Sequence, residues 1–368
     1  MQEQEELLYR IALSMLPGVG PVLARALHQY CGSATQVFRE KKSLLAKIPG
    51  IGQKRIRGAF SAPVFEQAEK ELRFVMKHKV KVLFYTDEAY PKRLNQCPDA
   101  PVLLYYKGTA SLNEGRLVAL VGTRSASPYG VDVTHRLVEG LRDHQVTVVS
   151  GLAYGIDICA HEAALKAGLP TIGVTAHGMD RIYPYGHRDT AGRMLQQGGL
   201  LTEYHSGTQP DRENFPSRNR IVAGMCDAVV VVEAGDKGGA LITAGLAQGY
   251  NRDVFAIPGR INDPFSSGCN AFIRENKAAL ITSAGDLVWM MGWSEERKLQ
   301  QPAVQTQLFP ELSPDEQRVT EVLKEQGECG IDAIAAATAF PFSKLANVLL
   351  QLEFKGVLKL KPGRRYTL

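Results

Sequence analysis

The sequence predicts an α/β protein built on a doubly wound parallel sheet, with a helical domain before the sheet and a winged helix after it. Short, unbroken apolar runs recur between residues 79 and 292, and amphipathic helical stretches separate them. Strands that are buried on both faces show such runs, and their alternation with helices is typical of a parallel sheet. The length of 368 residues exceeds one typical core, so two or three domains are expected.

Residues 1–78 predict a helical domain with an internal repeat. Residues 16–27 (LPGVGPVLARAL) and 48–60 (IPGIGQKRIRGAF) share a Pro-Gly-apolar-Gly turn followed by an amphipathic helix. This is a helix-hairpin-helix (SAM-like) pattern, in which the glycine turn leaves backbone N–H groups pointing outward. The basic side chains of the second copy are candidates for an additional DNA contact through phosphates, the alternative being a compact helical module. They are Lys54, Arg55 and Arg57.

Residues 79–292 predict the sheet domain. The expected strands are the apolar runs at 79–85, 101–108, 117–122, 146–151, 170–176, 199–203, 228–234 and 253–259. Ligands of such sheets bind beyond the C-terminal ends of the strands. The loops that follow these runs are therefore the first place to look for a site.

The end of the chain predicts a linker and a winged helix. Residues 293–310 are polar, Gln-rich and aperiodic, as linkers are. Residues 311–368 begin with Ser313, whose spacing to Glu316 predicts a capping box. Two more helices follow, then an alternating segment that turns at Pro362-Gly363. A winged helix can contact duplex DNA or dock a protein, and both alternatives stay open.

The loop after the run at 117–122 has features of an anion site. Gly122 and Thr123 allow close approach of an anion, and Arg124 can reach a phosphate. Ser127-Pro128 fits the N-cap and first position of a helix, whose positive end then lies nearby. The loop lacks GxGxxG, so a dinucleotide is not indicated. The alternative is a capped turn with a surface arginine.

Residues 211–245 combine three signals. Arg212, Arg218 and Arg220 surround Phe215, a buried-strand run follows, and Lys237-Gly238-Gly239 opens a helical pattern. Arginine forks suit phosphates, an aromatic ring can stack on a base, and a glycine-rich helix start offers N–H groups to an anion. The stretch therefore predicts a site for a phosphorylated, base-bearing ligand.

Two further groups of residues leave alternatives open. Asp157 and His161 share one helix face, either as an acid–base pair or as a carboxylate that holds a structural histidine. No third ligand at suitable spacing suggests a metal. In residues 176–189, tyrosines are interleaved with Arg181 and Arg188. That pattern suits single-stranded nucleic acid or an ordinary aromatic loop.

The composition and the N-terminal sequence indicate in which cellular compartment the protein resides. The net charge of +5 permits nucleic acid without demanding it. Six cysteines without a CxxC pair indicate reduced thiols. No apolar run reaches the roughly 18 residues of a spanning helix, and the N-terminus lacks a signal-peptide profile. We expect a cytoplasmic protein without a membrane segment.

The motifs VGTR, SGLAYGIDICAH, GMDRIYP, FPSRNRIVAG, EAGDKGGALITAG, IPG and SSGCN occur in this order over residues 80–285. In this respect the chain resembles the DNA-processing protein A family (DprA/Smf). The resemblance implies an extended Rossmann-like domain and a homodimer formed through it. It also implies a single-stranded-DNA-binding protein without a catalytic step or cofactor. Such a protein protects incoming DNA and loads the RecA recombinase during natural transformation.

By motif, the resemblance assigns phosphate contacts to Arg124, Arg218 and Arg220 and a base contact to Phe215. Asn219 would help to fix the pocket, Arg212 would add a basic position, and Lys237 with its glycines would form the rim. The single-stranded-DNA site predicted in full is Gly122, Thr123, Arg124, Arg212, Phe215, Arg218, Asn219, Arg220, Lys237, Gly238 and Gly239. The chain departs from the family pattern at Ala240, where a serine is usual, and at His187, where an asparagine is common.

Two other functions are weighed against this one. Phosphoribohydrolase-like enzymes resemble the chain in winding, but their PGGxGTxxE motif is missing, and the run at Lys237-Gly238-Gly239 lacks its glutamate. A sequence-specific regulator acting through the winged helix would need several base-reading polar residues. The expected recognition helix offers only Lys344, Asn347 and Gln351.

Overall fold

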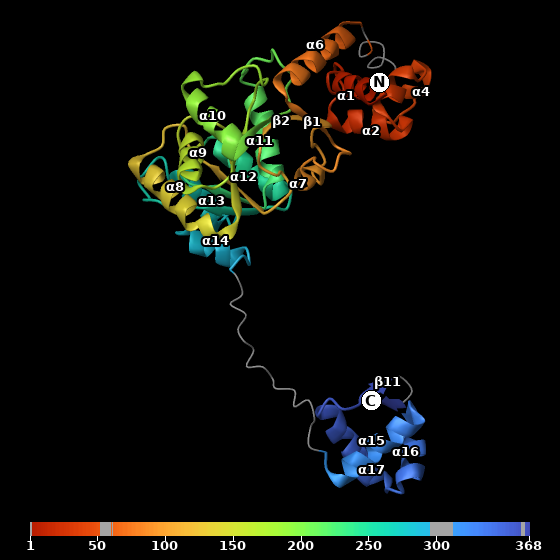
Figure 1. Cartoon of the computed structure of the whole chain (residues 1–368). Coiled ribbons are helices and arrows are strands. Elements are labelled where there is room, and N and C mark those ends of the chain that lie inside the picture. The colour runs from red at the N-terminus through yellow and green to blue at the C-terminus, as the bar shows by residue number, and fades with distance from the viewer. Residues whose placement is uncertain (1, 52–59, 61, 295–311, 362–364) are drawn as a thin grey trace. The chain divides into compact units, whose positions relative to one another are not determined.

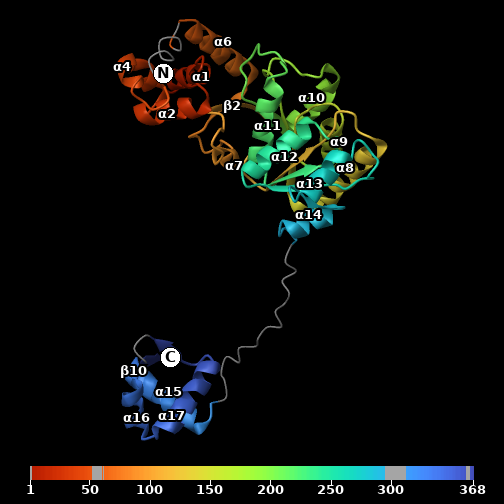
Figure 2. The same ribbon diagram turned by 180° about the vertical axis from the view of Figure 1, so that it is seen from behind.

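The computed structural model describes residues 2–51, 60, 62–294, 312–361 and 365–368. The chain divides into two compact units, Met1–Trp293 and Ser294–Leu368 (Figures 1 and 2). Each unit has an apolar core of its own. The linker predicted over residues 293–310 lies, from residue 295 onward, outside the described residues.

Helices open the first unit. They are α1 (Gln2–Ser14), α2 (Pro21–Cys31), α3 (Ala34–Arg39), α4 (Lys42–Leu45) and α6 (Ala62–His78). In the first copy of the repeat, Gly18 has a φ of +70°, which favours glycine. Pro21 then starts α2, where its missing N–H costs nothing. The second copy is described only to Ile51, so Lys54, Arg55 and Arg57 lie outside the described residues.

The sheet has nine strands in the order β1-β2-β6-β5-β4-β3-β7-β8-β9. Its strands are β1 (Lys81–Phe84), β2 (Leu103–Gly108), β3 (Arg116–Val121), β4 (Val146–Ser150), β5 (Thr171–Val174), β6 (Gly198–Thr202), β7 (Ala228–Val231), β8 (Asp253–Ala256) and β9 (Ala279–Leu280). From β6 to β9 the pairing is parallel, whereas β2 is antiparallel to both neighbours. This confirms the predicted doubly wound parallel sheet, to which β1 and β2 add an antiparallel edge that was not predicted.

The winding of the sheet reverses once. From β3 the chain adds β4, β5 and β6 on one side, and then returns to place β7, β8 and β9 on the other. β3 and β7 are therefore neighbours that flank the switch point, with Val121 paired to Val231. In open α/β sheets, the crevice at this point is where ligands bind.

Helices cover both faces of the sheet (Figures 1 and 2). They are α7 (Lys92–Asn95), α8 (Pro128–Gly140), α9 (Ile156–Ala167), α10 (Arg188–Gln197), α11 (Asn214–Met225), α12 (Gly239–Gly249), α13 (Ser267–Arg274) and α14 (Ala284–Met290). On β3, Val118 and Leu120 pack in one cluster with α8, α9 and α14, while Ala119 and Val121 share the other with α11 and α12. The alternation follows from the two-residue period of a strand.

The N-terminal helices share the second of these clusters. Ile11 and Leu27 belong to the same continuous core as Val121 and Ile221. Helical region and sheet therefore form one compact unit.

The second unit is a winged helix. It contains α15 (Pro314–Gln326), α16 (Ile331–Thr338), α17 (Phe342–Phe354) and a small sheet of β10 (Cys329–Gly330), β12 (Arg365–Thr367) and β11 (Lys359–Lys361). The predicted capping box is present, since Ser313 Oγ accepts from Glu316 N and the Glu316 carboxylate accepts from Ser313 N. The predicted turn at Pro362-Gly363 lies outside the described residues.

Within the described part of the chain, no single helix has both the length and the apolar composition to cross a membrane. One bent pair, Ile331–Thr338 with Phe342–Phe354, meets that test only when its two helices are taken together, and they meet at 111°.

Candidate functional site

A cavity of about 640 Å³ lies at the switch point of the sheet. The turns after β3 and β4, the start of α11 and the start of α12 line it. Ten of the eleven predicted site residues contribute to this lining, namely Gly122, Thr123, Arg124, Arg212, Phe215, Arg218, Asn219, Lys237, Gly238 and Gly239. Three separate stretches of sequence thus meet at one edge of the sheet.

The turn after β3 is fixed by close packing. A Cβ on Gly122 would lie 2.4 Å from the side chain of Ile156, so no larger residue fits. Ser127 caps α8 by accepting from Gly130 N at 3.1 Å, as predicted. The buried carboxylate of Glu233 accepts from Ser127 N and from the Ser127 hydroxyl. Thr123 and Arg124 therefore start from a rigid backbone.

The start of α12 forms the opposite wall. The helix begins at Gly239, and none of the described side chains caps it. The N–H groups of a first helical turn have no partner within the helix, and they carry the positive end of the helix dipole. Gly238, Gly239 and Ala240 line the cavity beside them. This wall can accept an anion.

Arg218 forms the floor of the cavity. Its side chain is 4% exposed, and Nη1 donates to Val174 O at 2.7 Å. Its Nε is buried without a hydrogen-bond partner among the described residues. Burial lowers the pKa of Arg218, and the neighbouring charge of Asp157 opposes that change. An arginine stays protonated in a protein, so the floor carries a cation with an unused donor.

Asp157 is the counter-charge at this floor. Its Oδ2 accepts from Gly151 N at 3.1 Å. Burial raises the pKa of Asp157, and the charge of Arg218 lowers it. The guanidinium of Arg218 also packs directly against Gly151, where a Cβ would lie 1.8 Å from Nη1.

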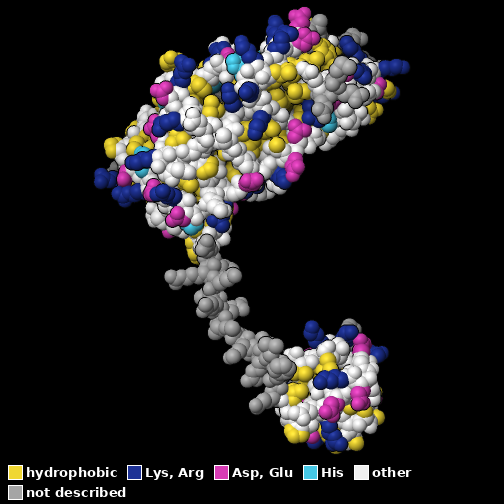
Figure 3. All heavy atoms as spheres, viewed as in Figure 1, with side chains coloured by type: hydrophobic (Ala, Val, Ile, Leu, Met, Phe, Trp, Pro, Cys, Tyr) yellow, Lys and Arg dark blue, Asp and Glu magenta, His cyan; other side chains and the backbone are white. Residues whose placement is uncertain are grey.

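Three exposed cations surround the opening. Arg124, Arg212 and Lys237 line the cavity. Within the described part of the chain, none of the three forms an ion pair. Elsewhere on the face seen in Figure 3, Lys and Arg are spread among acidic side chains and form no single band. The opening of the cavity thus gathers three exposed cations.

An aromatic ring stands beside these cations. The guanidinium of Arg124 lies 5.3 Å from the ring centroid of Phe215. The ring of Tyr183 lies 6.2 Å from that of Phe215, at an angle of 58°. Tyr183 lines the cavity but is not among the predicted site residues. The alternation of tyrosine and arginine in residues 176–189 is the signal that could have found it.

Arg220 is not brought to the cavity. One of its Nη atoms pairs with the Glu203 carboxylate and the other donates to Asp99 O. Positions 218 and 220 lie two apart on α11, and residues at that spacing point to nearly opposite faces of a helix. The prediction grouped both arginines in one site, but of the two only Arg218 lines the cavity.

Asp157 does not hold His161, so that sequence-based alternative is wrong. His161 Nδ1 contacts Thr171 Oγ1 at 2.7 Å, and its Nε2 has no partner among the described residues. Within the same part of the chain, no group of three His, Cys, Asp or Glu side chains could hold a metal ion.

Three family models match the chain. They describe a DNA recombination-mediator protein A over residues 81–292, a DprA winged helix domain over 302–364 and a SAM-like helix-hairpin-helix tandem over 11–57. Protein Smf of Synechocystis is 32% identical over 97% of this chain and 98% of its own length. A putative DNA processing protein DprA of Mycobacterium tuberculosis is 36% identical over 81% of this chain and 80% of its own.

Solved structures show the same likeness. The DNA processing protein A of Streptococcus pneumoniae superposes with a TM-score of 0.66 at 35% identity, covering 77% of this chain and 97% of that one. The protein from Helicobacter pylori, described for its single-stranded DNA binding mode, superposes with a TM-score of 0.53 at 31% identity. That match covers 58% of this chain and 95% of the other.

Proposed function

The chain belongs to the DNA recombination-mediator protein A (DprA/Smf) family, and we propose that it binds single-stranded DNA in the cavity at the switch point of its sheet. The observation that carries this proposal is the meeting of Arg124, Arg218, Lys237 and the start of α12 around one aromatic ring. The cations and the helix start hold phosphates. Phe215 meets a base.

The arrangement of cations around the cavity suits a phosphate group better than a carboxylate. Arg218 places a buried cation at the floor, while Arg124 and Lys237 approach from the rim. A phosphate has several acceptor oxygens, so it can engage the floor, the rim and the start of α12 at once. Guanidinium forks match this arrangement.

The aromatic ring favours a single strand. A base can stack on Phe215 only when it is splayed from its neighbours, which a duplex does not allow without unpairing. Stacking accepts any base because every base has a π-face. We therefore expect little dependence on base sequence.

No catalytic step is part of the proposal. The hydrolase alternative requires a free carboxylate near the glycine turn, and among the described lining residues the one carboxylate belongs to Asp157. That group lies at the floor, accepts from Gly151 N and balances Arg218. A structural role accounts for these contacts.

The wider role follows the family resemblance. We propose that the protein protects incoming DNA and loads RecA onto it during natural transformation, as a cytoplasmic homodimer formed through the Rossmann-like domain. Sedimentation of the purified protein tests the dimer. RecA-dependent strand exchange, with and without this protein, tests the loading step.

Titration with labelled single- and double-stranded oligonucleotides at several salt concentrations tests the binding site. We expect tighter binding of the single strand. Arg124→Ala should weaken it and reduce the slope of log K against log salt by about 0.7, the contribution of one phosphate contact. Arg136→Ala is the matched control, because this arginine is exposed on α8 and pairs with Asp132. Equal affinity for duplex, or equal slopes for both variants, would exclude the assignment.

A further inference from the structure

A second, small hollow adjoins the main cavity. Its volume is about 30 Å³, and Tyr154, Tyr183 and Pro184 contribute to its lining. Five residues line both this hollow and the main cavity, namely Arg124, Gly151, Ala153, Tyr183 and Phe215. The two hollows are therefore contiguous, and the guanidinium of Arg124 lies over the Phe215 ring in their shared lining.

Both tyrosine rings of this hollow are open to solvent. Tyr154 is 54% exposed and Tyr183 is 47% exposed. Large aromatic rings usually bury most of their surface. Two half-exposed rings beside a cationic cavity therefore mark a place where a flat, apolar group can bind.

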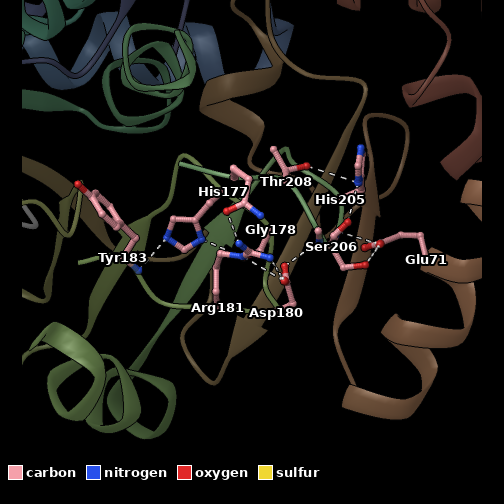
Figure 4. A network of polar contacts seen from close by, with 11 residues as sticks. Glu71, His177, Gly178, Asp180, Arg181, Tyr183, His205, Ser206 and Thr208 are labelled. Carbon is pink, nitrogen blue, oxygen red and sulfur yellow. Dashed lines mark hydrogen bonds and ion pairs between the residues drawn. The ribbon is translucent and has the colours of Figure 1, made fainter. Parts of the chain in front are cut away.

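The backbone beneath Tyr183 is fixed. Tyr183 N donates to His177 Nε2 at 3.2 Å, while His177 Nδ1 donates to Gly178 O at 2.9 Å. Both nitrogens of this buried imidazole are thus engaged, and burial lowers its pKa, which keeps it neutral. In Figure 4 the Tyr183 ring points away from His177.

A polar network ties the same loop to the rest of the molecule (Figure 4). Asp180 Oδ1 accepts from Gly207 N at 2.9 Å, and Gly178 N donates to Thr208 O at 3.3 Å. Glu71 of α6 accepts from Ser206 N at 2.8 Å and also from the Ser206 hydroxyl. The Tyr183 ring is exposed, but the loop that carries it is held by hydrogen bonds. Binding a ligand at the ring should therefore cost little conformational entropy.

Tyr154 is held in a similar way. Its ring meets that of His187 edge-on at 4.9 Å. His187 is buried, and its Nδ1 donates to Leu152 O at 2.9 Å. The departure from the family pattern at His187 thus places a rigid ring under Tyr154.

We propose that Tyr183 and Tyr154 form a second base-stacking site, which takes the nucleobase next to the one bound at Phe215. This site rests on the proposed binding of single-stranded DNA and extends its path by one nucleotide. The rings of Tyr183 and Phe215 are tilted by 58°, so they cannot sandwich one base between parallel faces. Each ring offers its face to a different base, while Arg124, which lines both hollows, neutralises the phosphate that links the two nucleotides.

Tyr183→Leu removes the aromatic face and keeps an apolar side chain of moderate size. With an oligothymidylate probe we expect affinity to fall about 5- to 150-fold, the range for losing one stacked base. Tyr183→Phe keeps the face and should retain affinity within about twofold. The salt slope should stay unchanged in both, because a neutral side chain releases no counterions. Tyr154→Leu is an independent second variant with the same expected direction.

A probe of the same length with abasic positions isolates the stacking. It should bind the wild type and Tyr183→Leu with equal affinity, because it has no base at these positions that could stack on the Tyr183 ring. Tyr185→Leu is the matched control, since Tyr185 is 75% exposed in the same loop but lines neither hollow. We expect no change for it with either probe.

The outcomes separate the two proposals. A wild type that does not bind the oligothymidylate would overturn the proposed function. Binding by the wild type with no loss in Tyr183→Leu and Tyr154→Leu would overturn the second site and leave the first. An equal loss with the abasic probe, or in Tyr185→Leu, would also overturn the second site, because the effect would not depend on stacking in this hollow.

Discussion

Arg218 and Arg220 show how two like residues in one motif can do different work. Arg218 faces the cavity, whereas Arg220 and Glu203 form a partly buried ion pair whose side chains are 13% and 15% exposed. Burial raises the pKa of Glu203, and Arg220 opposes that rise. Removing one partner of such a pair leaves a charge without compensation.

We therefore expect Arg220→Ala to act on stability. Its free energy of unfolding should fall by about 3 to 5 kcal/mol, measured by urea denaturation. The folded variant should keep the wild-type salt slope for single-stranded DNA. Adding Glu203→Gln should recover part of the loss, since the unpaired charge is then gone. A reduced salt slope would instead indicate that Arg220 contacts a phosphate of the DNA.

His161 provides a pH prediction at the same scale. Thr171 Oγ1 donates to Val148 O, so its lone pair accepts from His161 Nδ1 and the bare Nε2 is the atom that would protonate. Burial lowers the pKa of His161 from 6.5 to about 3. Between these values the unfolded chain binds a proton that the folded protein does not. Stability is therefore lost as the pH falls through this window.

His161→Gln keeps a donor for Thr171 and does not titrate. Relative to this variant, the wild type should lose about 2 to 3 kcal/mol of unfolding free energy between about pH 7 and about pH 4.5. Urea denaturation at a series of pH values measures the difference. Parallel profiles for the two proteins would contradict it.

Among the elements, α6 and the loop between β6 and α11 are joined by Glu71. This carboxylate is 1% exposed and accepts both polar hydrogens of Ser206. The loop leads on to Arg212 at the rim of the cavity. The helical region thus helps to position a basic side chain of the site.

Glu71→Ala should loosen this loop. We expect faster amide hydrogen exchange over residues 203–212 and an affinity for single-stranded DNA about 2- to 10-fold lower, the cost of ordering one long side chain on binding. Glu69→Ala is the control on the same helix, because Glu69 is exposed and meets only Arg73 among its described neighbours. Unchanged exchange in Glu71→Ala would show that the contact does not hold the loop.

The elements also show where sequence reasoning succeeds. The apolar runs predicted β1 to β8, and in β3 to β7 the burial of both faces leaves a local mark in the sequence. The direction of the Arg220 side chain could not be predicted from the local sequence. It depends on the rotation of α11 about its axis and on the position of Glu203 just after β6. Tyr183 was missed as a site residue for a related reason. Its approach to Phe215 joins the loop after β5 to the first turn of α11, which is distant in sequence.

At the scale of the whole molecule, the cations of the two units differ in their partners. In the winged helix, Lys344 pairs with Asp315, Lys355 with Glu316, and Lys361 and Arg365 with Glu328. The exposed side of α17 presents Phe342, Leu350 and Phe354. These four cations are engaged by carboxylates and are less available to phosphates. At the cavity of the first unit, Arg124, Arg212 and Lys237 form no ion pairs among the described residues.

We therefore expect the affinity for single-stranded DNA to reside in the first unit. A chain ending at Trp293 keeps the whole cavity and the core around it. It should bind an oligothymidylate within about threefold of the full chain and with the same salt slope, because the same phosphates are neutralised. Fluorescence anisotropy on both proteins, with Arg124→Ala in each, measures this. If truncation reduces the slope of log K against log salt by about 0.7 or more, the winged helix contributes at least one phosphate contact.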